Sequence, residues 1–118
     1  MPTDESDLGN IEISRHAIAT IACRAVSQSY GVVGMAARNV VDGLASALTS
    51  DPRKGVDVHV HEDGSVSIDL YVVMEYGVNL ATVSRSVAHQ VRYNVASIAG
   101  VPVDSVNVHV QGLRFSED

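Results

Sequence analysis

The chain has 118 residues and a mass of 12.5 kDa, with 46% hydrophobic and 19% charged residues, as is typical of one folded globular domain. Its net charge of −6 argues against general binding to DNA or RNA, and its one cysteine, Cys23, excludes an internal disulfide framework or a multi-cysteine metal site. No segment approaches the roughly 20 apolar residues of a membrane-spanning helix, and the acidic amino terminus lacks the pattern of a secretory signal, so we expect a cytoplasmic protein without direct membrane insertion.

The first part of the sequence predicts an arm, a short strand and a helix. Residues 1–10 are acidic and poor in apolar side chains, so we expect a flexible arm. Residues 11–13 alternate like a very short strand, and Ser14 is placed to cap a helix that ends before Gly31. Apolar residues within 40–48 also fit a further amphipathic helix.

The pattern changes to strict alternation after residue 55. Residues 56–60 and 66–74 alternate apolar with polar side chains on either side of a turn, which predicts a β-hairpin. Asn79 is placed to cap a longer helix that ends at Gly100, and residues 106–110 predict a last strand. We expect one group of valines to face the helices, namely those at 56, 58, 60, 106, 108 and 110.

This order of elements predicts an α+β domain of two layers over residues 11–115, followed by a short tail over residues 116–118. The expected sheet is small and mostly antiparallel. It consists of the central hairpin with an amino-terminal and a carboxy-terminal strand, and the helices pack on one of its faces.

Several short segments resemble the alkaline shock protein family of bacterial envelope stress response proteins. The matching segments are IEIS and GVVGM in the amino-terminal part, KGVDV, IDLYVV and YGVN in the centre, and VNVHV near the carboxyl terminus. The chain departs from the family pattern at residues 28–30 and over residues 40–48, so the role of residues 30–50 is left open.

The resemblance implies a non-enzymatic protein of cell-envelope homeostasis, without catalytic residues or a cofactor. It also implies a membrane-anchored or other envelope-associated partner that holds the protein near the membrane. Self-association into a homo-oligomer is left open.

Two surfaces are candidates for binding such a partner. The first is the polar face of the expected sheet, where Tyr71 supplies the large contact area that interfaces favour; its candidate residues are His59, Asp69, Tyr71 and His109. The second is the longer helix, where Arg85, His89 and Arg92 form a basic stripe. For both surfaces an ordinary solvated face is the simpler explanation.

Metal binding by the sheet face is the alternative function. If the two strands are neighbours, His59, His61 and His109 can converge with Asp57 or Asp69 at the ligand distances of zinc. Polar alternation also arises simply because water covers one face of a sheet, so we expect no stoichiometric metal. Exposed histidines can instead respond to pH. The sequence has no catalytic motif, and we expect Cys23 to pack at the edge of the core.

Overall fold

The computed structural model describes residues 12–37 and 51–115 of the chain. Three of the predicted segments lie outside this part: the arm over residues 1–10, the helix over residues 40–48 and the tail over residues 116–118. The elements are α2 (Arg15–Ser27), β1 (Val32–Met35), the 3₁₀ turn η1 (Pro52–Gly55), β2 (Val56–Val60), β3 (Val66–Glu75), α3 (Leu80–Asn94), the π-helical turn η2 (Val95–Ala99) and β4 (Val103–Arg114).

Both predicted helix caps are confirmed. The side chain of Ser14 accepts a hydrogen bond from the backbone N–H of Ala17 at 3.0 Å, and Asn79 accepts one from Thr82 at 3.0 Å. Each cap satisfies a backbone donor that has no partner within its own helix. α3 continues into η2 and ends at Gly100, whose φ of +74° is the left-handed conformation that glycine adopts readily.

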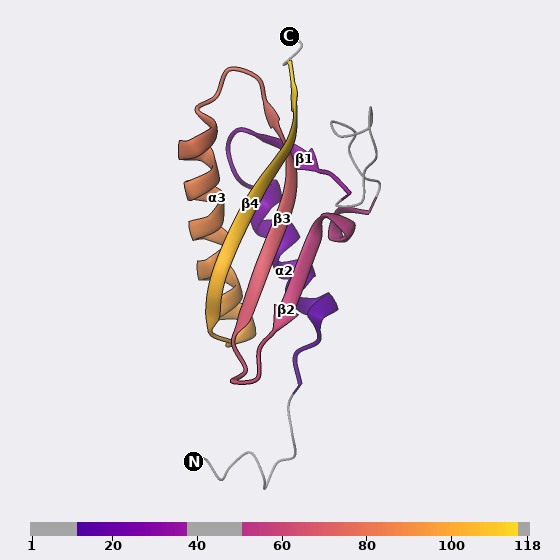
Figure 1. Ribbon diagram of the computed structural model, residues 1–118, viewed down its shortest axis with the longest axis vertical. Helices are drawn as coiled ribbons and strands as arrows, with labels where there is room; N and C mark the ends of the chain where they lie inside the picture. The colour runs from indigo at the N-terminus through magenta and orange to yellow at the C-terminus, as the bar shows by residue number, and fades with distance from the viewer. Residues whose placement is uncertain (1–11, 38–50, 116–118) are drawn as a thin grey trace, which may run out of the picture.

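The four strands form one sheet with β3 at its centre (Figure 1). β4 pairs with β3 in parallel along its whole length, while β1 and β2 pair with it antiparallel. Because β4 occupies one edge of β3, β1 and β2 share the other edge end to end. The parallel pair follows from the crossover through α3, which returns the chain to the end of β3 where that strand began. The expected two-layer α+β class and mostly antiparallel sheet are thus confirmed.

The amino-terminal strand is not where the sequence analysis placed it. Glu12 and Ile13 belong to no strand, and Ile11 lies outside the described residues. The strand that fills this role is β1, which follows α2. Gly31, at φ +89°, redirects the chain back along β3, and its carbonyl accepts a hydrogen bond from the N–H of Glu75 at 2.9 Å. Residues 12–13 come directly before the cap at Ser14 and pair with no strand of the described sheet.

The core lies between one face of the sheet and the two helices. It includes Val66, Ile68, Leu70, Val72 and Met74 of β3, Ile18, Ala22 and Val26 of α2, and Val83, Val87, Val91 and Val95 of α3 and η2. Among the valines expected to face the helices, those at 56 and 58 are buried, and those at 106, 108 and 110 are partly buried against the core.

Two apolar side chains are less buried than the periodicity predicted. Val60 is 51% exposed, because it lies at the last residue of β2, beside the hairpin turn. Ile98 is 68% exposed although helical periodicity places it in line with the buried valines 83, 87, 91 and 95. It belongs to η2, where the wider π turn changes the helical phase and moves Ile98 off the buried side.

Candidate functional site

The open face of the sheet, opposite the helices, carries the predicted recognition residues. Asp57 of β2 lies directly across from Asp69 of β3, and Tyr71 of β3 lies directly across from His109 of β4. His59 follows two residues after Asp57 and therefore projects from the same face. The structure thus brings together the four residues that alternation assigned to this surface, with Asp57 beside them.

Asp69 links two imidazoles on this face. Its Oδ1 is 3.0 Å from Nε2 of His109, and its Oδ2 is 3.9 Å from Nε2 of His59, which itself lies 3.2 Å from Oδ2 of Asp57. The ring of His109 stacks on Tyr71 with 4.5 Å between centroids and 13° between planes. Stacking and the contact with Asp69 together fix the orientation of the two rings before any ligand arrives.

The three histidines do not meet at one point. Nε2 of His61 lies 2.7 Å from Oγ of Ser67 and 3.8 Å from Oδ2 of Asp104, near the hairpin turn. Within the described residues, the set whose ligand atoms all lie within 4.8 Å of one another is Asp57, His59 and Asp69, which we call the carboxylate–imidazole group. A structural zinc site uses four protein ligands, so this group is one short.

The basic stripe of α3 divides into two different environments. Arg92 reaches the start of β4, where its Nη1 donates a hydrogen bond to the carbonyl of Val103 at 2.6 Å. Arg92 therefore ties α3 to the sheet. Arg85 is exposed, and no hydrogen bond or ion pair to another residue is recorded for it in the part of the chain that the structure describes. Of the two arginines, Arg85 is thus the better candidate for a binding contact.

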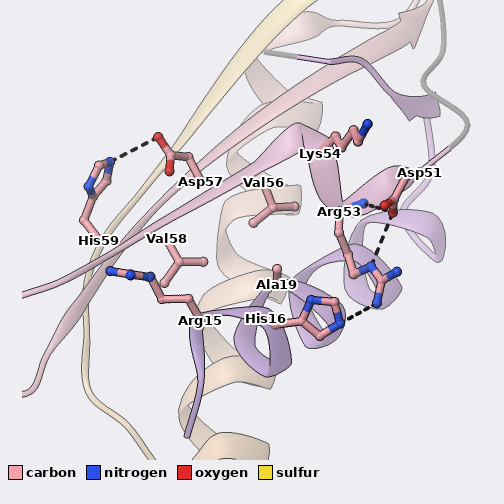
Figure 2. A pocket seen from close by; sticks show the side chains of 10 residues that line it. All are labelled: Arg15, His16, Ala19, Asp51, Arg53, Lys54, Val56, Asp57, Val58 and His59. Carbon is pink, nitrogen blue, oxygen red and sulfur yellow. Dashed lines mark hydrogen bonds and ion pairs between the residues drawn. The ribbon is translucent and has the colours of Figure 1, made fainter. Parts of the chain in front are cut away.

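A groove of about 500 Å³, which we call the basic groove, lies between the first turns of α2 and the segment of η1 and β2 (Figure 2). Its basic residues come from both elements: Arg15, His16, Arg53 and Lys54. Its apolar lining is provided by Ala19, Val56 and Val58, and its remaining residues are Asp51, Asp57 and His59.

Arg53 is held in place inside the basic groove. Its Nε donates to Oδ1 of Asp51 at 3.3 Å, and its Nη1 donates to Nε2 of His16 at 2.6 Å. The backbone N–H of Arg53 also donates to Asp51 at 3.2 Å and, with the guanidinium, keeps the pKa of that carboxyl below its ordinary value. Asp51 therefore stays ionised and positions Arg53.

Sequence reasoning missed the basic groove and one aromatic contact. The sequence analysis assigned no function to residues 51–55, although their two adjacent basic side chains were a visible signal. The residues Tyr76 and Phe115, which are 57% and 72% exposed, directly follow the last residues of β3 and β4. The centroids of their rings lie 4.5 Å apart. Cys23 is half-buried next to the core, as expected, and burial raises the pKa of its thiol to about 11.

The helices of the described part of the chain include none that is long and apolar enough to cross a membrane.

Comparison with known proteins places the chain among envelope-related proteins. Residues 3–115 match the family model of alkaline shock protein 23, whose description is a cell envelope-related function. The uncharacterized protein YloU of Bacillus subtilis is 40% identical over 110 residues, which cover 92% of this chain and 91% of that protein.

Two further relatives also match over most of their length. An uncharacterized protein of Streptococcus pyogenes is 38% identical over 108 residues, covering 90% of this chain and 88% of its own length. YqhY of Bacillus subtilis, also uncharacterized, is 30% identical over 116 residues, which cover 98% of this chain and 84% of that protein. No solved structure matches the chain significantly. The chain belongs to the alkaline shock protein family, whose function is related to the cell envelope.

Proposed function

We propose that the chain is a non-enzymatic protein-binding or scaffolding module of cell-envelope homeostasis. In this proposal, a membrane-anchored or other envelope-associated partner binds the open face of the sheet and holds the protein at the cytoplasmic side of the membrane. The envelope-related function of the family supports the setting. The module's part in the envelope stress response is the finer expectation that follows from the same resemblance.

The observation that carries the proposal is the stacked pair of Tyr71 and His109. Tyrosine is enriched among residues that dominate binding energy at protein interfaces, because it buries a large area at a small cost in side-chain entropy. Here the ring is already oriented by its neighbour at 4.5 Å, and His109 is in turn fixed by Asp69 at 3.0 Å. A preorganised aromatic ring with polar groups around it is suited to recognising another protein.

The test is recovery of membrane proteins after crosslinking to the purified full chain. Replacing Tyr71 by Ala removes the anchor, and we expect recovery to fall by at least about fivefold, corresponding to more than 1 kcal/mol. Tyr71→Phe keeps the ring and should retain most of the binding. Tyr93→Ala, an equally large truncation at a side chain that is 64% exposed on α3, is the matched control.

Salt concentration separates this surface from α3. Contacts steered by Arg85 should weaken as the Debye length falls from about 8 Å to about 3 Å, whereas an interface anchored by Tyr71 should largely persist. If Tyr71→Ala and Tyr93→Ala reduce recovery equally, or neither reduces it while both proteins remain folded, the open face is not the binding surface. If Arg85→Ala alone abolishes recovery, the partner binds α3.

A further inference from the structure

Within the part of the chain that the structure describes, the outer edge of β2 pairs with no other strand, and we call it the free edge. The N–H of His61 donates to the carbonyl of Ser65 at 2.8 Å, which closes the hairpin with a hydrogen-bonded pair. Such pairs alternate along an antiparallel ladder, so Asp57 and His59 bond to β3, and the backbone N–H and C=O groups of Val58 and Val60 point away from it. No other strand of the described sheet pairs with this edge of β2.

The hydrogen bonds of β3 support this assignment. Val66 lies across from Val60 in a pair that is not hydrogen-bonded, and its N–H donates to Pro102 at 3.0 Å, on the side of β4. Its partner in the ladder, Val60, must then direct its own backbone groups to the opposite side, toward the free edge. An unpaired edge of this kind is a template for another strand.

The free edge runs beside the basic groove. Val58 of β2 and Ala19 of α2 line the groove, while Arg15 and Arg53 stand on its two sides (Figure 2). With Lys54, these are three of the eight lysines and arginines of a chain whose net charge is −6. The concentration of cations along one strand edge is complementary to an acidic ligand.

Arg15 supports this interpretation independently. It is the first residue of α2, where a cation is unfavourable because the helix dipole is positive at that end. The structure records no hydrogen bond or ion pair for Arg15 within the described residues. Its guanidinium therefore costs a little stability where it stands, and no carboxylate among the described residues neutralises it.

We propose that β2 accepts an extended segment of an acidic partner protein as an added antiparallel or parallel strand, with carboxylates that bind Arg15 and Arg53. Residues that lie across from Val58 and Val56 on the added strand project toward the helices and hence into the basic groove. The residue between them faces Asp57 and His59, where a carboxylate would be repelled. The segment should therefore carry acidic side chains at alternate positions.

This inference rests on the proposed protein-binding role but assigns a different surface. The probe is a blocked nine-residue peptide of alternating Glu and Thr, titrated into the full chain, with alternating Lys and Thr as the control peptide. We expect saturable binding of the acidic peptide alone, together with slower hydrogen exchange at the amides of Val58 and Val60. Failure of either expectation overturns the proposal.

Charge variants on α2 test the role of the groove. Arg15→Gln should weaken binding of the acidic peptide by about tenfold, because a charge-assisted hydrogen bond is lost. Arg24→Gln makes the same change of charge in the last turn of α2 and should leave the affinity unchanged. Since Arg15 opposes the helix dipole, its replacement should not unfold the protein. Equal weakening by both variants would mean general electrostatic attraction and would overturn the assigned site.

Backbone variants test the added strand. Val60→Pro removes an N–H that points to the free edge and leaves the ladder with β3 intact, so it should abolish binding, while Val60→Thr should retain it. Binding that survives in a folded Val60→Pro protein would overturn strand addition. If, in the absence of peptide, hydrogen exchange at the amide of Val60 slows as the protein concentration rises, the edge binds a second copy of the chain instead. Tyr71→Ala should not change the affinity for the peptide, so failure here is distinguishable from failure of the open-face proposal.

Discussion

Gly55 is the last residue of η1, directly before β2, and the close packing around it can be tested by adding one methyl group. It is buried, and a Cβ at this position would lie 2.6 Å from the carbonyl oxygen of Ala36 and 3.0 Å from Cε of Met35. The methionine end can move aside, but the carbonyl belongs to the backbone next to β1. Gly55→Ala therefore forces the segments of β1 and η1 apart.

The size of the effect follows from that contact. Even attractive C–H···O contacts have carbon–oxygen distances of about 3.3 Å, so the backbone must shift by roughly 0.7 Å. Overpacking of this kind costs about 1–3 kcal/mol. For a chain of this length each kcal/mol lowers Tm by about 3–6 °C, which gives an expected decrease of about 3–18 °C.

Thermal unfolding and amide chemical shifts measure the two parts of this prediction. Gly64→Ala is the contrast, because no atom lies within 4 Å of its added Cβ and only its φ of +91° opposes the change. Its strain should cost about 1–2 kcal/mol and shift amides only around the hairpin turn. Gly55→Ala should shift amides of Met35 and Ala36 as well. A Tm within about 2 °C of the native value, or shifts confined to η1, would refute the steric argument.

Three further outcomes follow from the same structure. The raised pKa of Cys23, about 11, keeps the thiol protonated at pH 8, so labelling by a thiol reagent should be slow until the chain is unfolded. The free energy of unfolding should fall above pH 9, because the thiol of the unfolded chain ionises at a lower pH than the thiol of the folded chain. Arg92→Ala should lower the free energy of unfolding by about 1 kcal/mol in denaturant titrations because the carbonyl at the start of β4 loses its donor, whereas Arg85→Ala should change it by less than about 0.5 kcal/mol. Elemental analysis of protein purified without an affinity tag should find no stoichiometric metal, because the three ligand atoms of the carboxylate–imidazole group are one fewer than a structural zinc site uses and its histidine is exposed to water; one zinc per chain retained through dialysis would contradict this.

The features that were predictable from the sequence are local ones. Ser14 and Asn79 act on backbone donors three residues away, and the hairpin depends on alternation across a short turn. The polar face was predictable for the same reason, because alternation alone assigns Asp69, Tyr71 and His109 to the side away from the helices.

One feature that was missed depends on pairing across a long stretch of sequence, and another depends on a local departure from regular helix geometry. β1 has only four residues and becomes a strand because β3, more than 30 residues later, offers it an edge. The change of helical phase at η2 has no equivalent in a fixed period of 3.6 residues, and that period alone places Ile98 on the buried side of the helix. Tertiary pairing decides the first case, and the local π turn decides the second.

The basic groove shows where a local signal could have been used. His16 and Arg53 are 37 residues apart, and no spacing rule predicts their contact at 2.6 Å. The position of Arg15 was nevertheless visible, since a residue that follows a helix cap meets the positive end of the helix dipole. A natural sequence that departs from such a rule without local compensation commonly does so at a functional site. The unfavourable charge of Arg15, in the groove beside the free edge of β2, thus supports the proposal that an acidic partner binds there.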